Sequence, residues 1–561
     1  MNYGMDPDIV NHPTWGPQLA GALTAIPSLS IVTDLEHFFD PTTGIYVNAS
    51  EDSIVWERPT SVELIDPLGL EEGFQVDAGI RIRGGFSRSD NNPKHSFRLF
   101  FRSEYGAPKL NYALFGDEGV DEFDKVDLRT SQNYSWAFQG DVRNIMNRDV
   151  FSRDTQADLG DPYTRSRYYH LYIDGVYWGL YQTQERAEAD FASQYFGGEP
   201  EDYDVIKVEA GPYTINATDG TLDAWQALWD LANLGFETDA KYYAVQGLNP
   251  DGTRNASLPV YIDVDNLINY MIIILYGGNK DAPISNFLGN NSPNNWYGIY
   301  NRTTQDQGFQ FFAHDAEHTL LTADLNINRN GPWPARDTFS KSNPQWIHQQ
   351  LMYHPEYRMR FADLIQKHFF NGGALTVESN TERFLDRASE IDLAIIAESA
   401  RWGDSKVSTP RTKTHWQAEI DNIVNNYFTQ RGNIVLEQWR NTVLRDASFA
   451  PLFPSIDAPS FNVHGGIVGP LFPLTIAAPN GVIYYTLDGS DPRLPGGSIN
   501  PNALIFDGSS SSQTLITPGS TWKYLDDGSN QGTAWRETGF NDVAWSSGAA
   551  PLGYGDGDEE T

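Results

Sequence analysis

The apolar and polar positions in the first third of the chain follow the pattern of β-strands. Residues Ala78–Gly85 alternate apolar and basic side chains up to a glycine pair, and Lys94–Phe101 form a second apolar run after a polar turn. This period of two predicts two strands joined by a loop. Farther on, Asp174 and Gly175 separate two aromatic runs within Tyr168–Gln184. An Asp-Gly pair in this setting predicts a β-hairpin, because it favours the tight turn that joins such strands.

The spacing of apolar residues then changes to that of helices, which dominate the second half of the chain. It predicts helices over Trp136–Arg153, Ala187–Tyr195, Leu222–Leu234, Val264–Tyr276, Trp346–Tyr353, Arg358–Phe370, Thr381–Ala397 and His415–Tyr427. A β-rich part followed by a helical part predicts an α+β fold of two lobes, a β-rich N-lobe and a helical C-lobe, with a cleft between them.

The composition changes near Ala450, where a proline-rich stretch begins. Such a stretch predicts a domain boundary. Short runs typical of strands follow, first over Thr475–Thr486 and again beyond Ser512. We therefore expect small all-β modules at the C-terminal end. The first thirty residues predict a short amphipathic lead-in, Gln18–Thr24, and a strand, Leu29–Thr33.

The composition also narrows the class of protein. The 561 residues are 40% hydrophobic and 13% aromatic, which is enough for large packed cores in two or more domains. The formal net charge of −35 excludes nucleic-acid binding as a default role, because such binding needs a basic surface. The chain has no cysteine, which excludes disulfide scaffolds, thiolate nucleophiles and Cys-ligated zinc.

The sequence predicts neither a membrane span nor a signal peptide. The longest dense apolar stretch, Met271–Tyr276, has the length of a buried core segment. Residues Met1–Asp6 lack the basic and apolar regions of a signal peptide. The sequence stops inside an unfinished β-rich pattern, so we expect a fragment of a larger protein.

One segment has the residue spacing of a phosphotransfer site. Asp281 follows a predicted apolar helix and a glycine pair, and Asn286 stands five residues later. In protein kinases an Asp and an Asn at this spacing share one rigid loop, where the Asp accepts the proton of the substrate hydroxyl and the Asn holds a metal ion. The same two residues also suit a turn after a helix, so the pair alone does not decide.

Asp315 supports the phosphotransfer interpretation. It follows the second strand of a hairpin predicted over Asn295–Phe312. Kinases place their metal-chelating Asp at this point, after the catalytic loop. Carboxylate and amide oxygens suit Mg²⁺ or Mn²⁺. The three groups in this chain order therefore predict a phosphotransferase that uses ATP and a divalent metal ion.

Several motifs give the chain a resemblance to the CotH kinase family. The motifs are Lys94–Leu99, Asp127–Ser131, Asp141–Asn144, Tyr172–Glu185, Gly278–Asn286 and His314–Glu317. The resemblance covers about residues 75–440 and implies an atypical protein-kinase-like fold. It also implies an exported protein, since the family is associated with export and, in spore formers, with the spore coat. Asp281 is then the expected catalytic base.

The resemblance implies roles for further residues. It implies metal binding by Asn286 and Asp315, and contact of Lys94 with the nucleotide phosphates. Glu185 is expected either to line the nucleotide site or to pair with Lys94, and both alternatives stay open. Relatives often carry a second Asp where this chain has Glu317, so Glu317 is a further candidate metal ligand on a longer side chain.

The domains expected from these patterns are a lead-in segment over residues 1–27 and a CotH-like kinase domain over 28–447. A β-module is expected over 448–512, where Tyr485–Pro492 resemble the small C-terminal module of chitobiase and hexosaminidase. A truncated β-sandwich that resembles the opening of a jelly roll is expected over 513–561.

The expected reaction is phosphorylation of Ser or Thr hydroxyls of exported or surface proteins, at an extracellular or cell-surface location. One alternative is a catalytically inactive, kinase-like scaffold whose C-terminal modules contact carbohydrate. Another is a zinc peptidase, because His314–His318 match His-x-x-Glu-His. That chemistry needs both His on one face of a helix, whereas Phe309–Phe312 predict a strand just before the motif.

Overall fold

The computed structural model describes residues 4–333, 338–469, 472–506, 519–525, 535 and 540–549. The chain forms two compact units, Met1–Phe453 and Pro454–Thr561. Helices and strands are mixed and the first unit contains a large sheet, which confirms the α+β class. The boundaries expected for the lead-in, the kinase domain and the β-modules stay predictions.

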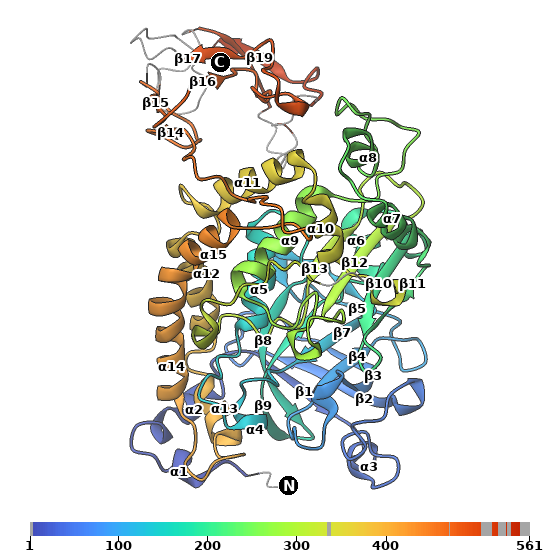
Figure 1. The fold of residues 1–561 in the computed structure, drawn as a ribbon. Helices are drawn as coiled ribbons and strands as arrows, with labels where there is room; N and C mark the ends of the chain where they lie inside the picture. The colour runs from blue at the N-terminus through green and yellow to red at the C-terminus, as the bar shows by residue number, and fades with distance from the viewer. Residues whose placement is uncertain are drawn as a thin grey trace. The chain divides into compact units, whose positions relative to one another are not determined.

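Seven strands of the first unit close into a barrel (Figure 1). Around the barrel they are β1 (Ser28–Val32), β2 (Arg58–Ile65), β3 (Gln75–Arg83), β4 (Ser96–Phe100), β7 (Lys125–Arg129), β9 (Val176–Gln184) and β8 (Ser166–Ile173). Strand β8 closes the ring by pairing in parallel with β1, whereas the other neighbours are antiparallel. The hairpin predicted around Asp174-Gly175 is confirmed as β8–β9, and both turn residues have positive φ. Two short strands, β5 (Leu110–Asn111) and β6 (Glu122–Phe123), pair outside the barrel.

The two faces of the barrel wall differ in chemistry, because successive side chains of a strand point to opposite faces. Apolar residues of β3, β4 and β7 bury one face in the barrel core; they are Ala78, Ile80, Ile82, Phe97, Leu99, Val126 and Leu128. The residues between them carry charge on the other face. Arg81 is directly opposite Arg98, and Arg98 is directly opposite Asp127. The outer face of these strands is therefore a ladder of charged groups.

A second sheet lies beside the barrel in the first unit. Its order is β11 (Thr214–Asp219), β10 (Tyr203–Glu209), β12 (Trp296–Asn301) and β13 (Gln310–Ala313). The pairing of β12 with β13 confirms the hairpin predicted there. Helix α9 (Val264–Gly277) packs against β13 and against α5 (Arg148–Asp158). Every residue of α9 except Asp265 is buried, as expected for a helix that is apolar on all sides.

The other helices of the first unit pack around these sheets (Figure 1). They are α1 (Pro7–Val10), α2 (Leu19–Ala22), α3 (Leu35–Phe39), α4 (Trp136–Gln139), α6 (Ala189–Phe196), α7 (Asp223–Asn233), α8 (Asp239–Ala244), α10 (Pro344–Leu351), α11 (Pro355–Phe369), α12 (Val377–Glu390), α13 (Ile395–Trp402), α14 (Lys413–Asn422) and α15 (Thr429–Arg440). None of the described helices is both long and apolar enough to cross a membrane.

Two predicted helices are interrupted in the structure. The run Trp136–Arg153 is divided between α4 and α5, because Gly140 adopts a left-handed conformation (φ 62°) that ends α4. The run Thr381–Ala397 is divided between α12 and α13, with turns at residues 391–394. Apolar spacing continued through both interruptions, so periodicity alone did not reveal them.

The second unit contains short antiparallel strand pairs in its described residues. They are β14 (Ser460–Phe461) with β15 (Ile476–Ala477), β16 (Ile483–Tyr485) with β17 (Leu504–Phe506), and β18 (Thr521–Tyr524) with β19 (Ser546–Ala549). Both strands predicted over Thr475–Thr486 form, but each pairs with another partner rather than with the other. Much of the module expected over 513–561 lies outside the described residues.

A buried ion pair connects the barrel to α13. Lys94 Nζ, just before β4, lies 2.7 Å from Glu398 Oε1 on α13, and the two side chains are 1% and 2% exposed. Lys94 also donates to the Leu180 carbonyl oxygen at 2.9 Å, and Glu398 accepts the Leu180 N–H at 2.7 Å. Both charges are thus satisfied inside the protein, and the pair joins α13 to β9 and to the chain before β4.

We expect Lys94→Met to lower the free energy of unfolding by about 3–5 kcal/mol, because it leaves the Glu398 carboxylate buried without a partner. Chemical denaturation followed by circular dichroism measures this loss. The double variant K94M/E398Q removes both charges and should be more stable than K94M. A K94M protein as stable as the wild type would contradict the structural role of the pair.

Candidate active site

The end of α9 places Asp281. Gly278 ends the helix in the left-handed conformation, with φ at 61°. A Cβ at this position would come within 2.8 Å of Ile327 Cγ2, so both the backbone angle and the space favour glycine. The Asn279 side chain then accepts the Asp281 N–H at 2.8 Å. The chain thus turns away from a buried helix and presents Asp281 on a short, hydrogen-bonded loop.

Neutral donors orient the Asp281 carboxylate. Ser285 Oγ donates to Oδ1, and the side-chain amides of Asn294 and Asn295 donate to Oδ2, both at 3.1 Å. Burial raises the pKa of Asp281, and the negative charge of Asp315 contributes to the increase. A carboxylate that is held by neutral donors and has a raised pKa suits a group that orients or receives a proton.

Asp315 lies just beyond the end of β13 and pairs with Arg129 of β7. Arg129 Nη2 is 2.5 Å from Asp315 Oδ1. The same guanidinium is 3.4 Å from Asp149 of α5 and donates to Gln184 of β9 at 3.1 Å. Burial acts to raise the pKa of Asp315, but the positive charge of Arg129 outweighs it and holds the pKa below its usual value. Asp315 is therefore a carboxylate, and its side chain is 36% exposed.

Backbone strain is concentrated around this ion pair. Asp315, Leu320, Tyr134 and Met146 all have positive φ, between 51° and 63°. Residues other than glycine rarely adopt this backbone conformation, and for bulky residues it is an outlier. Such outliers persist where the surrounding structure enforces them, and they are common at functional sites. Four of them in the segments that surround Arg129 and Asp315 mark this region as a candidate active site.

Glu317 contacts the loop that follows β7. Its Oε1 accepts the Gln132 N–H at 3.0 Å, and its Oε2 accepts the Asn133 N–H at 2.8 Å and the Asn133 side-chain amide at 3.0 Å. Burial, together with the charge of Asp315, raises the pKa of Glu317 to about 7. Both oxygens are occupied, so the structure uses Glu317 to hold the loop that starts at Thr130. Metal binding by Glu317 would require it to exchange these bonds.

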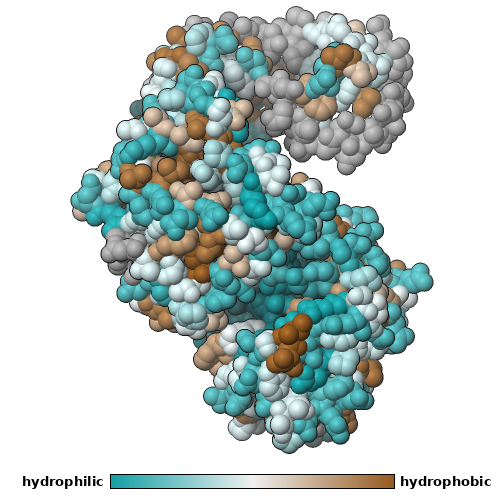
Figure 2. Space-filling view, turned by 90° about the vertical axis from the view of Figure 1, so that its right-hand side faces the viewer, coloured by the Kyte–Doolittle hydropathy of each residue, from teal (hydrophilic) through white to brown (hydrophobic). Residues whose placement is uncertain are grey.

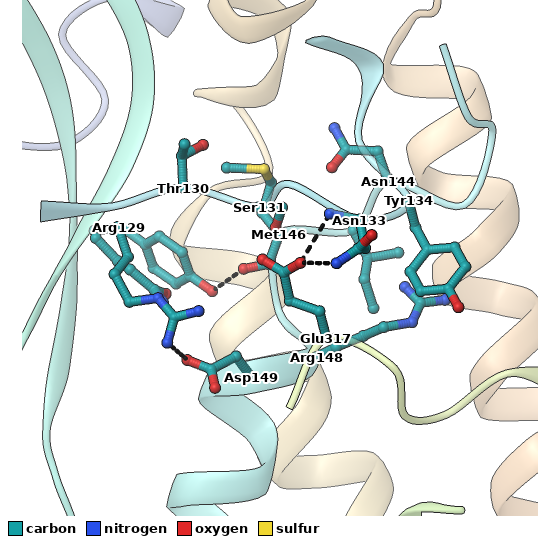
Figure 3. Close-up of a pocket in the computed structure, with 13 residues that line it drawn as sticks. Arg129, Thr130, Ser131, Asn133, Tyr134, Asn144, Met146, Arg148, Asp149 and Glu317 are labelled. Atoms are coloured by element: carbon teal, nitrogen blue, oxygen red, sulfur yellow. Dashed lines mark hydrogen bonds and ion pairs between the residues drawn. The ribbon is translucent and has the colours of Figure 1, made fainter. Parts of the chain in front are cut away.

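A small pocket lies beside this network (Figure 3). Arg129, Asp149, Glu317 and Asn144 are among its lining residues. Both side-chain amide atoms of Asn144 are buried and have no partner among the described residues, and the same holds for Oε1 of Gln182, which also lines the pocket. Buried polar atoms are almost always paired, so the pocket offers spare donors and acceptors to a bound molecule.

Sequence analysis assigned no role to several of these residues. Arg129 and Asn144 stand inside two of the motifs that it singled out, and Asp149 lies in a predicted helix. What the sequence shows at these positions is a charged or amide side chain where the apolar pattern predicts burial. Such a signal does not identify its partners, because Arg129 meets Asp149 and Asp315 only in the folded chain.

The structure separates Lys94 and Glu185 from each other. Lys94 pairs with Glu398, as described above. Glu185 pairs with Arg165 at 3.1 Å and accepts a hydrogen bond from the Tyr195 hydroxyl. The alternative that Glu185 pairs with Lys94 is therefore wrong in this structure. Glu185 instead lines a second small pocket, whose other lining residues include Asp127, Arg186 and His314.

Asn286 follows Asp281 on the same loop, and its N–H donates to the Lys280 carbonyl oxygen at 2.7 Å. Its side chain is exposed and makes no hydrogen bond to Asp315 in the described structure. No cluster of three or more His, Asp or Glu that could enclose a metal ion occurs among the described residues. The donors at this site are therefore the partly exposed Asp315 carboxylate and the exposed Asn286 amide, both hard oxygen ligands.

The peptidase motif does not form the geometry that its chemistry needs. Residues 314–318 follow β13 without forming a helix, and Asp315 has φ at 51°. The ring of His314 lies against Arg83 and Tyr297, whereas His318 accepts or donates at the Tyr134 hydroxyl, 2.8 Å away. The two His thus belong to different environments, and the zinc-peptidase interpretation is wrong for this fold.

The comparison with known proteins agrees with the motifs. The pattern that describes the family "CotH kinase protein" matches residues 80–435, which is well over half of the 561 residues. The matched part contains the Asp281 loop, the Arg129–Asp315 pair and both pockets. No curated protein matches the chain. With the match extending over most of the first unit, the chain belongs to the CotH kinase family.

Proposed function

We propose that the protein transfers the γ-phosphoryl group of ATP to a hydroxyl group of Ser or Thr in another protein. The observation that carries the proposal is the convergence of Asp281 and Asp315. One follows a buried helix and the other a buried strand, yet backbone hydrogen bonds join their two segments: Lys280 N–H donates to the His318 carbonyl oxygen at 3.3 Å, and Leu320 N–H donates to the Gly277 carbonyl oxygen at 3.0 Å. Two such carboxylates, on a kinase-like family member, suit phosphoryl transfer, which depends on placement and on charge compensation.

Asp281 orients the acceptor in the proposed reaction. A bond forms between the acceptor hydroxyl oxygen and the γ-phosphorus as the bond from that phosphorus to the β–γ bridging oxygen breaks, and ADP leaves. Asp281 receives the hydroxyl proton. Ser285, Asn294 and Asn295 keep both carboxylate oxygens in place, and Asp281 forms no ion pair among the described residues that would hold it away from an acceptor.

Asp315 and Asn286 are the residues that would hold Mg²⁺ or Mn²⁺. Asp315 uses Oδ1 for Arg129, and its side chain remains 36% exposed. Kinase-type magnesium sites combine one or two carboxylates with phosphate oxygens and water, without a complete cage of protein ligands, so these residues fit such an ion. When bound, the ion would neutralise phosphate charge. Glu317 becomes a further ligand only if it releases the loop N–H groups.

The location and the C-terminal modules belong to the same proposal. An extracellular or cell-surface position follows from the family association with exported proteins. The acceptor would then be an exported or surface protein. The second unit would act as a spacer or a carbohydrate contact; its strand pairs are compatible with a small β-module, and the resemblance at Tyr485–Pro492 is the support for it.

One observation favours a catalytically inactive scaffold as the second candidate. Arg129 occupies Asp315 Oδ1 at 2.5 Å, and a cation in this place competes with a metal ion for the same carboxylate. If the pair never opens to a metal, the site would bind partners without turning over. The following experiments separate the two functions.

Asp281→Asn is expected to lower phosphorylation of a mixed protein acceptor by about 10²- to 10⁴-fold, because the amide cannot receive the proton. Asp315→Asn should abolish detectable transfer, since it removes the charged metal ligand. Incorporation of radiolabelled γ-phosphate into protein measures both. The matched control is Asp306→Asn, which changes an exposed carboxylate in the β12–β13 turn of the same hairpin. Equal incorporation by all four proteins would contradict the phosphotransferase, and none in the wild type would favour the scaffold.

Mg²⁺-ATP is expected to raise the melting temperature of the wild type by roughly 3 °C at an ATP concentration 100 times its Kd. EDTA should remove the increase, and Asp315→Asn should reduce it at the same Mg²⁺ concentration. Differential scanning fluorimetry measures the change. An ATP-dependent increase that EDTA leaves intact would argue against the metal site at Asp315.

A further inference from the structure

Lys94 is enclosed within the protein and is not exposed at the candidate active site. Its Nζ contacts Glu398 and the Leu180 carbonyl oxygen, and its side chain is 1% exposed. A Cβ added to Gly179 would lie 2.8 Å from Lys94 Cε, so the aliphatic part of the side chain is packed as tightly as its charge is paired. To reach a phosphate, Lys94 would have to leave a buried carboxylate unpaired, which costs several kcal/mol.

Arg83, unlike Lys94, lies near the candidate metal ligand Asp315. It is the last residue of β3 and precedes Gly84 and Gly85. Its side chain lies on the outer, charged face of the barrel, where Nε donates to Asp127 at 2.7 Å. Its Nη2 is 3.4 Å from Nε2 of His314, the residue next to Asp315. Arg83 therefore stands on the barrel wall that faces the candidate metal ligand.

The glycine pair brings the backbone close to the same place. Gly84 has φ at 113°, a conformation that side chains rarely adopt. A Cβ on Gly85 would lie 2.6 Å from Ala210 Cβ, in the β10–β11 turn. The loop after Arg83 thus bridges the barrel and the second sheet. On the face shown in Figure 2, hydrophilic side chains line a hollow at the height where barrel and second sheet meet.

Arg83, whose side chain is 9% exposed, shares its carboxylate partner with other arginines. Asp127 is shared by three guanidinium groups, those of Arg83, Arg98 and Arg186. Burial lowers the pKa of Arg83, and the nearby positive charge of Arg129 lowers it further, although Asp127 opposes both effects. Arg186 also pairs with Glu188, whereas Arg83 and Arg98 pair with no carboxylate other than Asp127 in the described structure. A phosphate beside Arg83 would give its guanidinium a second anion.

We propose that Arg83, rather than Lys94, is the cation that binds the phosphates of ATP in this protein. The inference rests on the proposed function, because it takes Asp315 as the residue beside the phosphates. The guanidinium keeps Nε on Asp127 and offers its Nη groups to phosphate oxygens, which match the planar fork of an arginine. Lys94 serves instead to hold α13 against the barrel.

Arg81 provides a matched control. It lies two residues earlier on β3, on the same outer face, and also pairs with one carboxylate, that of Glu57 at 2.7 Å. Its guanidinium carbon lies 4.1 Å from the centre of the Phe100 ring, and no contact with His314 or Asp315 is present in the described structure. A general effect of removing an arginine from this strand should therefore appear equally in Arg81→Gln and Arg83→Gln.

Isothermal titration of the full chain with Mg²⁺-ATP tests the proposal. We expect Arg83→Gln to weaken ATP binding by roughly 10- to 100-fold, the range for loss of one charge-assisted hydrogen-bonded contact. Adenosine, which lacks phosphates, should bind equally to R83Q and to the wild type. Arg81→Gln and the charge-free pair K94M/E398Q should bind ATP like the wild type. Melting temperatures of all variants show that they are folded.

The outcomes are distinct. If the wild type binds no ATP, the proposed function fails, and the assignment of Arg83 fails with it. If the wild type binds ATP and R83Q binds it equally well, or if folded K94M/E398Q alone loses binding, the proposed function stands and the Arg83 assignment is overturned. Should R83Q not fold, Arg83→Lys keeps a cation for Asp127 but removes the guanidinium fork; ATP binding weaker than in the wild type supports the proposal, and equal binding overturns it.

Discussion

The candidate site depends on one buried guanidinium, that of Arg129. It projects from the barrel strand β7 and pairs with Asp149 on α5 and with Asp315 after β13, while it also donates to Gln184 on β9. Barrel, helix and second sheet therefore meet at a single charged group that is 3% exposed. Without Arg129 the partly exposed Asp315 carboxylate would lose its ion-pair partner, whereas Asp149 would keep Arg153 at 3.2 Å.

Ion pairs of this kind join structural elements with a large desolvation penalty, since each ion must lose water. Asp127 repeats the arrangement a few residues away, where one carboxylate accepts from Arg83, Arg98 and Arg186. An apolar interface would hold the same elements together at less cost. Arginines are favoured at a junction that also binds an anion, because the same guanidinium groups then contact both the protein carboxylates and the ligand.

The two carboxylates of the candidate site are held by different kinds of contact. Asp281 stands on a loop anchored by the wholly buried α9, and neutral side chains hold it. Asp315 stands on a strained turn whose conformation depends on ion pairs. Asp281 is thus positioned by hydrogen bonds from neutral side chains, whereas Asp315 is positioned by an ion pair.

Much of the site was accessible from the sequence, because its signals are local. The turn after α9, the spacing of Asp281 and Asn286, and the exit of Asp315 from an apolar strand all depend on neighbours within about ten residues. The partners of Lys94 and Glu185 were not accessible in this way. Glu398 lies 304 residues from Lys94, and nothing in either local pattern connects them.

The sequence by itself determined the α+β class, the hairpins at Asp174-Gly175 and at β12–β13, the apolar helix before Asp281 and the chain order of the two carboxylates. These follow from periodicity, turn chemistry and spacing, which are properties of short segments. Only the tertiary structure decided that the strands close into a barrel, that Glu317 holds a loop and that Lys94 is buried against α13. It also decided that Arg83 lies beside His314 and that Arg129 pairs with Asp315. The physical reason is that ion pairs and barrel closure are formed between distant segments, and a charged residue in a strand carries no local sign of which carboxylate it will meet.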